Sequence, residues 1–190
     1  SAFAEYEGRE TRRDGSISVC RLTWSLKLTP AAPCRVWIDI ETAPESPLSL
    51  WRISVQVPGG WAITSIEFPI VPGIRRKDRM LLYAPSGWGV SYPLEPGLNF
   101  EGPYPSWASG VQMMAVQDAE MQKGLYVAAH DPEGALKTLH CRATAESASC
   151  SISHPLSLVP HPDGIYTIPW PAAIGFYRGD YFEAARIYRG

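Results

Sequence analysis

Two short acidic pairs are the residues whose spacing could support bond-cleaving chemistry. Asp39 and Glu41 stand at positions i and i+2 of an alternating run, which would place both on one face of a strand. Carboxyl groups about 6.5–9.5 Å apart can cleave a glycosidic bond with inversion, one acting as acid and the other as base. Asp118 and Glu120 have the same spacing in a turn-like stretch. An ordinary solvated strand face or turn is the alternative, and we expect that alternative for both pairs.

A histidine and a carboxylate are adjacent at His130-Asp131, at the end of an apolar run and directly before a proline. Such a pair at a strand end can bind a hydroxyl-rich ligand, or the histidine can act as a general base. Alternatively, Asp131 starts an Asx turn before Pro132 and His130 packs locally. Both interpretations remain open at this stage.

Residues 85–107 form a connection rich in proline, glycine and aromatic residues. Sugars stack their C–H faces on tryptophan and tyrosine, so this region is a candidate carbohydrate-binding surface. Aromatic residues that cover one end of a sheet, or that contact another domain, are the alternatives. The candidate residues are Trp88, Tyr92, Tyr104 and Trp107.

The four cysteines contain no CxxC pair, so a zinc or redox motif is not expected. Cys141 and Cys150 flank the polar stretch 142–149, and in a hairpin they would lie directly opposite each other. Cross-strand neighbours at a non-hydrogen-bonded position are close enough for a disulfide. A candidate Cys141–Cys150 disulfide therefore stands beside the alternative of four reduced cysteines, and the compartment stays open between a cytoplasmic and a secreted protein.

Composition excludes several classes of function. The chain has 190 residues, a hydrophobic fraction of 45% and a net charge of −2, which gives no basic footprint for nucleic acid. No apolar run reaches the ~18 residues that a membrane span needs. GxGxxG, P-loop, HExxH and G-x-S-x-G motifs are all missing from the sequence, so we expect no nucleotide cofactor, no metal and no serine nucleophile.

The elements that must position these residues follow a period of two. In Ser18–Leu28 the even positions are apolar and the odd positions polar, the pattern of a half-buried strand. Similar runs, each bounded by proline or glycine, give about ten strands and almost no helical signal before residue 179. The sequence therefore predicts an all-β fold, an antiparallel β-sandwich with a short C-terminal helix.

The last segment, residues 179–190, has the pattern of an amphipathic helix. Asp180 is the expected N-cap, with Glu183 three residues later as in a capping box. An apolar stripe on this helix needs a surface to pack on. We expect a β-sandwich domain over residues 1–178, and a connector helix over 179–190 that leads to a further, C-terminal domain.

The order of several short motifs resembles a known family. They include Ile66-Glu-Phe-Pro69, Leu81-Leu-Tyr-Ala-Pro-Ser-Gly87, Gly124-Leu-Tyr-Val-Ala-Ala-His-Asp131, Ile168-Pro-Trp-Pro171 and Gly179-Asp-Tyr-Phe-Glu-Ala-Ala-Arg-Ile-Tyr-Arg189. Together they are similar to the N-terminal β-sandwich, a galactose-mutarotase-like supersandwich, of bacterial glycoside-hydrolase-like proteins that continue into a TIM barrel. The resemblance covers roughly residues 60–190. It implies that the catalytic carboxylates belong to the barrel, at the C-terminal ends of its strands.

The sequence thus predicts a non-catalytic module of a glycoside hydrolase that supports the barrel, with a candidate role in carbohydrate binding. A free-standing carbohydrate-binding module is the first alternative. A mutarotase-type sugar enzyme that uses His130 with a nearby carboxylate is the second. Neither nucleic acid nor a membrane is an expected partner, and the oligomeric state and sugar specificity stay open.

Overall fold

The computed structural model describes residues 4–29, 32–87, 89–107 and 109–189. The chain divides into two compact units, which are described separately. Unit 1 comprises Ser1–Ile66 and Pro155–Pro171, and unit 2 comprises Glu67–His154 and Ala172–Gly190. The described residues form fourteen strands and one helix, and every strand pair with a determined register is antiparallel. The predicted all-β fold with a short C-terminal helix is confirmed.

Unit 1 is an antiparallel meander in the order β1-β2-β3-β4, with β13 pairing with the outer side of β4. Successive side chains of each strand point to opposite faces, so the alternating sequence gives the sheet one apolar and one polar face, as predicted. Leu22 on β2 lies opposite Ile38 on β3 on the apolar face, and Arg21 lies opposite Asp39 on the polar face. The strands of unit 1 are β1 (Ala4–Asp14), β2 (Ile17–Thr29), β3 (Ala32–Thr42), β4 (Leu48–Gln56) and β13 (Ile165–Thr167).

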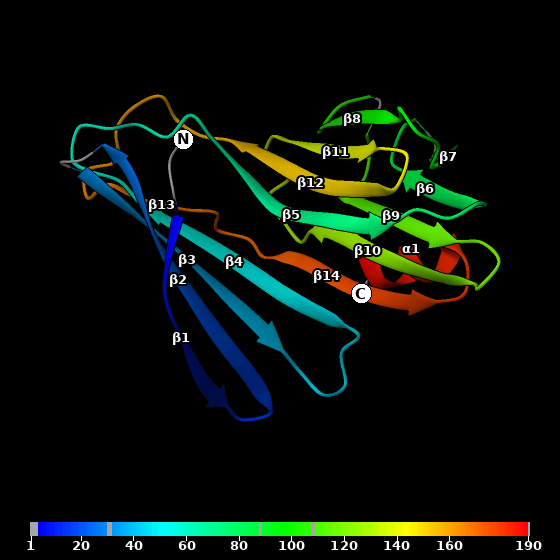
Figure 1. Ribbon diagram of the computed structural model, residues 1–190, viewed down its shortest axis with the longest axis horizontal. Coiled ribbons are helices and arrows are strands. Elements are labelled where there is room, and N and C mark those ends of the chain that lie inside the picture. Colours follow the sequence, from blue (N-terminus) through cyan, green and yellow to red (C-terminus); the bar gives the residue numbers. More distant parts are fainter. Residues whose placement is uncertain (1–3, 30–31, 88, 108, 190) are drawn as a thin grey trace. The chain divides into compact units, whose positions relative to one another are not determined.

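Unit 2 is a sandwich of two sheets (Figure 1). One has the order β14-β10-β9-β6-β7 and the other the order β5-β12-β11-β8. The strands are β5 (Ser65–Arg75), β6 (Met80–Ala84), β7 (Val90–Pro93), β8 (Asn99–Tyr104), β9 (Met113–Asp118), β10 (Lys123–Ala129), β11 (Lys137–Ala143), β12 (Ser147–Pro155) and β14 (Ala172–Arg178).

The core of unit 2 lies between these sheets. Leu82, Met114 and Val127 from one sheet, and Leu139 and Ile152 from the other, are all fully buried. Strand β10 is buried at six of its seven positions, so it reads as a continuous apolar run rather than an alternating one.

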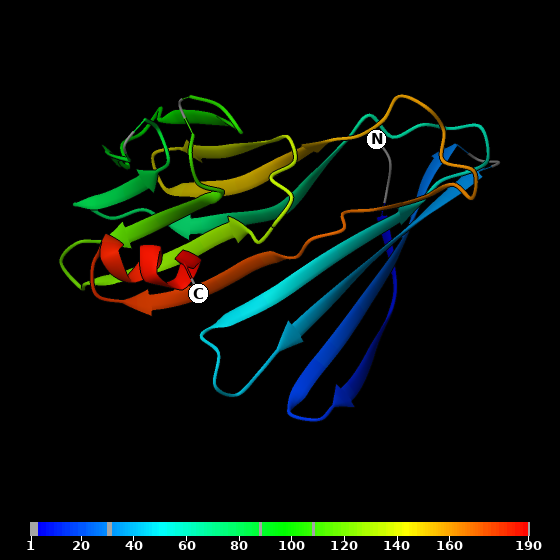
Figure 2. The same ribbon diagram turned by 180° about the vertical axis from the view of Figure 1, so that it is seen from behind.

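Helix α1 (Tyr181–Arg189) packs on the sheet that contains β9, β10 and β14, on the side seen in Figure 2. Ala184 is fully buried there. The apolar stripe of the helix therefore has a partner within unit 2, and it does not by itself require another domain. The assignment of residues 179–190 as a connector remains a prediction.

The expectation of one long connection over residues 85–107 is wrong, because this region contains β7 and β8. Both strands stand at the end of the strand order of their sheet. Proline is tolerated at sheet edges, because its missing N–H group breaks no ladder hydrogen bond there, whereas glycine weakens a strand because it has no side chain to pack. Pro93, Gly102 and Pro103 therefore obscured two genuine strands.

Candidate functional site

The predicted pair His130-Asp131 lies where β10 ends and a short turn leads to β11. The Asp131 carboxylate organises this turn: Oδ1 accepts a hydrogen bond from the Glu133 amide at 2.8 Å, and Oδ2 accepts one from the Ala135 amide at 2.7 Å. This is the Asx-turn arrangement of an aspartate before a proline. The geometry thus favours the structural alternative for Asp131.

Lys137 completes this arrangement from the first position of β11. Its Nζ lies 2.7 Å from Asp131 Oδ2, and both side chains are fully buried. The same ammonium donates a hydrogen bond to the Ala135 carbonyl. Burial opposes ionisation of Asp131, but the hydrogen bonds from Lys137 and the two amides outweigh it and lower the pKa of the carboxyl. The carboxylate is therefore charged and fully engaged by protein groups.

Two further side chains enclose the ion pair. The Tyr104 ring, at the end of β8, lies with its centroid 4.8 Å from the Lys137 ammonium, a cation–π contact. Gln112 donates from Nε2 to the Asp131 carbonyl at 2.8 Å and to the Tyr104 hydroxyl at 3.4 Å. Gln112 and Lys137 were not singled out in the sequence. Gln112 directly precedes β9 and Lys137 is the first residue of β11, and a polar residue at a strand start is too common to mark a site in the sequence.

His130 is held between tyrosines. Its Nε2 lies 3.0 Å from the Tyr126 hydroxyl, and its ring lies edge-on to that of Tyr188 from α1, 6.5 Å between centroids. Burial lowers the pKa of the imidazole, so it is neutral at pH 7. Among the described residues, no ion pair or hydrogen bond joins His130 to a carboxylate. The histidine–carboxylate chemistry of a mutarotase-type enzyme finds no support here.

Of the four predicted aromatic residues, the three that the structure describes contact different neighbours. Tyr92 on β7 packs against Phe100, with 5.7 Å between ring centroids, and Tyr104 covers the buried ion pair. Trp107 is 95% exposed and lies within the tight turn that the Ser106–Ser109 bridge closes. Trp88 lies outside the described residues. Among the described residues of this group, Trp107 is therefore the one most open to a ligand.

The two acidic pairs have the surroundings of structural residues. Asp39 accepts a bidentate interaction from Arg21, with 2.7 Å and 2.6 Å contacts, and Glu41 pairs with Arg52 at 3.3 Å. Asp118 caps a turn by accepting the amides of Glu120 and Met121. In the described parts of the chain, no group of three or more His, Cys, Asp or Glu side chains could hold a metal ion.

Cys141 and Cys150 lie directly opposite each other on β11 and β12, as the hairpin prediction requires. The Thr144 amide donates a hydrogen bond to the Ser147 carbonyl in the turn, so 144–147 is a hydrogen-bonded pair. Because hydrogen-bonded and non-hydrogen-bonded pairs alternate along an antiparallel ladder, the Cys141–Cys150 pair is a non-hydrogen-bonded one. Both cysteines are buried thiols in this structure. The hydrogen bond to Cys141 and burial raise the pKa of Cys150. The strand register is compatible with a Cys141–Cys150 disulfide, and the disulfide itself remains a prediction.

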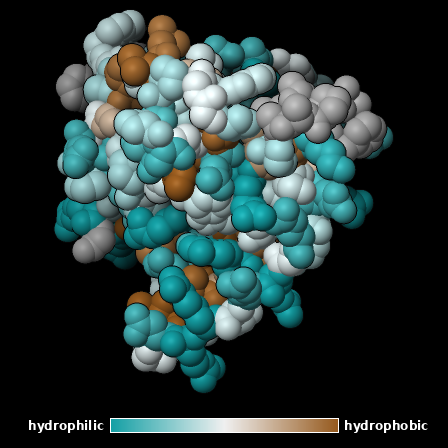
Figure 3. Space-filling model, turned by 90° about the vertical axis from the view of Figure 1, so that its left-hand side faces the viewer, coloured by the Kyte–Doolittle hydropathy of each residue, from teal (hydrophilic) through white to brown (hydrophobic). Residues whose placement is uncertain are grey.

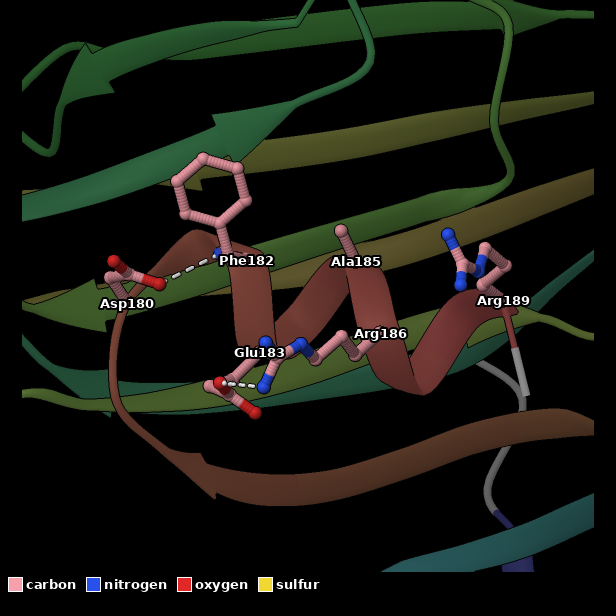
Figure 4. A pocket seen from close by; sticks show the side chains of 6 residues that line it. All are labelled: Asp180, Phe182, Glu183, Ala185, Arg186 and Arg189. Carbon is pink, nitrogen blue, oxygen red and sulfur yellow. Dashed lines mark hydrogen bonds and ion pairs between the residues drawn. The ribbon is translucent and has the colours of Figure 1, made fainter.

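The outer side of α1 forms a shallow hollow that Figure 4 shows from close by. Asp180 is the N-cap, as predicted, and accepts the Phe182 amide at 2.9 Å. The Glu183 carboxylate lies 2.8 Å from Arg186. Phe182 is 56% exposed beside these charges. Exposed side chains of one helix line this hollow, and it holds no convergent catalytic groups.

Two curated relatives match the sequence of this chain, whereas no protein-family model does. One, named "Putative glycoside hydrolase", from Bacteroides thetaiotaomicron, is 26% identical over 185 residues, covering 96% of this chain and 27% of the relative. The other, "Putative glycoside hydrolase 22789" from Monosiga brevicollis, is 28% identical over 151 residues, covering 77% of this chain and 11% of the relative. The chain therefore spans less than a third of the curated relatives it matches.

Solved structures with a similar fold include enzymes named as glycosidases. The alpha-N-acetylgalactosaminidase NagBb from Bifidobacterium bifidum, in its Gal-NHAc-DNJ complex, superposes with a TM-score of 0.71 at 13% identity, covering 98% of this chain and 30% of that one. The GH36 alpha-galactosidase AgaB from Geobacillus stearothermophilus gives 0.63 at 9% identity, covering 94% and 28%. The chain has the fold of a β-sandwich portion of glycoside hydrolases, as the motif resemblance implies, and most of each of those enzymes lies outside the match.

Proposed function

We propose that this chain is a non-catalytic β-sandwich module of a glycoside hydrolase, one that supports a catalytic barrel. The observation that carries the proposal is the asymmetry of coverage: 96% of this chain matches only 27% of a relative named as a glycoside hydrolase. A module that supplied the whole active site would need two suitably spaced, available carboxyl groups. Asp39, Glu41, Asp118 and Asp131 are instead held by arginines, a lysine or backbone amides.

The connector role of α1 is part of the same proposal. The helix is capped at Asp180 and held on unit 2, so a chain that continues beyond it would leave from a fixed surface. Two of the proteins with similar solved structures are named as an alpha-N-acetylgalactosaminidase and an alpha-galactosidase. We propose α-linked galactose-type sugars as the substrate class of the assembled enzyme.

The proposal is tested with the longer polypeptide that places a barrel after this module. We expect it to hydrolyse nitrophenyl α-galactoside or α-N-acetylgalactosaminide, and we expect the separated barrel to lose solubility or melting temperature. Adding the module back as a separate chain should restore part of that loss. A barrel that is equally stable and active without the module would contradict the supporting role.

Carbohydrate binding by unit 2 is a second candidate function, favoured by the 95% exposure of Trp107. A tryptophan this exposed offers its ring face to a sugar. Trp107→Ala should weaken retention of the chain in polysaccharide affinity gels. Because Trp107 is so exposed, the variant should keep the wild-type melting temperature. Unchanged mobility in every gel that retards the wild type would remove this candidate.

A further inference from the structure

The polar face of the unit 1 sheet carries a row of residues that runs across its strands. The pairings Gly8–Thr23, Thr23–Trp37, Trp37–Ser54 and Ser54–Thr167 place one tryptophan in a line of glycine and small hydroxyl residues. Ser54 and Thr167 share a hydrogen bond of 2.9 Å, so they face the same side. Trp37 is only partly buried. A large aromatic side chain thus stands among small ones on an open surface.

Charged rows flank this line on both sides. On one side, Glu10, Arg21, Asp39 and Arg52 lie opposite one another on successive strands. On the other side, Arg35 lies between Ser25 and Gln56. The Glu7 carboxylate lies 3.2 Å from Arg35, and a register shift between Tyr6 and Gly8 accounts for its place on this face. A β-bulge on an edge strand redirects side chains in this way.

A hollow of about 560 Å³ lies over this arrangement, entirely within unit 1. Its lining includes Gly8, Thr23, Trp37, Arg21, Arg35 and Gln56. Gly8 lines the hollow without a side chain, a Cβ atom built there meets nothing within 4 Å, and its φ is not in the left-handed region. In Figure 3, which faces the left-hand side of Figure 1, hydrophilic residues cover most of the surface and hydrophobic ones form small patches.

The chemistry of the hollow fits a neutral sugar chain. A tryptophan ring provides a stacking surface for C–H groups, while threonine, glutamine and carboxylate–guanidinium pairs provide adjacent donors and acceptors for hydroxyl groups. The charges compensate each other, because Arg21 is paired with Asp39 and Arg35 with Glu7, and the two other charged lining residues, Arg9 and Glu10, have opposite signs. The hollow therefore offers polar groups without a net charge that would select an anionic ligand.

We infer that this hollow on the polar face of β1–β4 is a binding site for neutral oligosaccharides, with Trp37 as its stacking residue. The ligand class rests on the proposed glycoside-hydrolase function, whereas the position of the site rests on the geometry of unit 1. The site is separate in sequence from Trp107 and from the other aromatic residues of the 85–107 region, and nothing in the alternating pattern of β3 distinguishes Trp37 from an ordinary outward-facing strand residue.

Isothermal titration of the 190-residue chain tests the inference. The probes are xylohexaose, cellohexaose, maltohexaose and galactomannan oligosaccharides, with a heparin oligosaccharide as an anionic probe. We expect a neutral probe to bind, and Trp37→Ala to weaken that binding by at least about tenfold, which is ~1.4 kcal/mol. Gly8→Leu should have a similar effect, because it fills the hollow and removes no interaction. Phe176→Ala is the matched control and should bind as the wild type does, because Phe176 is an exposed aromatic residue on β14 of unit 2 and lies outside the hollow.

Each outcome bears on one claim. If no neutral probe binds, or if only heparin binds, the site is overturned and the non-catalytic proposal stands. Binding that survives both Trp37→Ala and Gly8→Leu but is lost in Trp107→Ala moves the site to unit 2 and overturns the inference. Far-ultraviolet circular dichroism and melting of each variant show whether a loss of binding reflects a loss of fold. Gly8→Leu gives a second readout if Trp37→Ala unfolds.

Discussion

At the scale of single residues, the turn after β10 depends on a buried charge pair rather than on apolar contacts. Asp131 receives two amides and the Lys137 ammonium, and both side chains have no exposure to solvent. A paired buried charge contributes specificity, but a single buried charge is strongly destabilising. The same residues that could have marked a sugar-binding carboxylate therefore hold the β10–β11 connection in place.

Removing one member of this pair should destabilise the chain severely. Lys137→Met leaves the Asp131 carboxylate buried without its counter-ion, and we expect a loss of about 3–5 kcal/mol in the free energy of unfolding. Urea denaturation followed by tryptophan fluorescence measures this loss. Arg79→Met is the matched control, because its pair with Glu120 is exposed and should contribute at most about 1 kcal/mol. Equal effects of the two substitutions would contradict the account.

Stability should also fall as the pH drops below neutrality. Burial lowers the pKa of His130 and His154 from the ordinary value of 6.5. The unfolded chain therefore binds protons first, and the folded state loses stability as the pH falls through about 6.5 and below. The urea midpoint should decrease between pH 7 and pH 5, and His130→Gln should make the decrease shallower. A midpoint that is constant over this range would show that neither imidazole is held neutral.

At the scale of elements, a series of contacts that starts at Gly124 on β10 positions the N-terminus of α1. A Cβ atom on Gly124 would lie 2.1 Å from Cζ of Tyr177 on the neighbouring strand β14. The Tyr177 hydroxyl donates to Gln117 at 3.0 Å, and Gln117 donates to the Gly179 carbonyl at 2.9 Å, directly before the Asp180 cap. Position 124 thus determines where the tyrosine ring lies, and the ring helps determine where the helix begins.

Gly124→Ala should therefore destabilise the chain by about 1–3 kcal/mol, the cost of overpacking a closely packed site. Thermal and urea unfolding measure this change. Gly110→Ala is the control, because nothing lies within 4 Å of a Cβ built there and its φ is not positive. If Gly124→Ala were as stable as Gly110→Ala, the ring of Tyr177 would not be fixed by the glycine.

The β11–β12 hairpin should accept a disulfide. Cys141 and Cys150 already form a non-hydrogen-bonded cross-strand pair, so oxidation needs little backbone movement. Peptide mapping of the protein under non-reducing conditions, after mild oxidation, should find the 141–150 linkage and leave Cys20 and Cys34 as thiols. Free Cys141 and Cys150 after oxidation of the denatured and refolded chain would contradict this prediction.

The sequence predicts best those strands that alternate or that are fully apolar. β2, β3, β4 and β10 follow from the period of two or from a continuous apolar run. β1 was not predicted because ten of its eleven residues are exposed, and pairing with β2 rather than burial makes it a strand. β7 and β8 were obscured by edge prolines and glycine. Gly8, Thr23 and Trp37 are neighbours only because their strands pair, so the sequence cannot show that they lie together unless the strand register is known.

At the scale of the whole chain, the proposed function depends on the size of the proteins that contain a matching segment. Its relatives carry the matching segment as less than a third of their length, and none of the described helices is long and apolar enough to cross a membrane. Within the described residues, the carboxylates singled out from the sequence are all engaged by protein groups. A supporting module that binds neutral sugar chains on unit 1 accounts for the fold, the engaged carboxylates and the open hollow.

The most direct test of the central claim is the rate at which the 190-residue chain alone hydrolyses a panel of nitrophenyl α- and β-glycosides. The account predicts no release of nitrophenol above the buffer rate across the panel, from a sample whose circular dichroism shows folded β structure. Hydrolysis that follows the concentration of the chain, and that is lost on replacing one of its carboxylates by the corresponding amide, would contradict the claim that this module is non-catalytic.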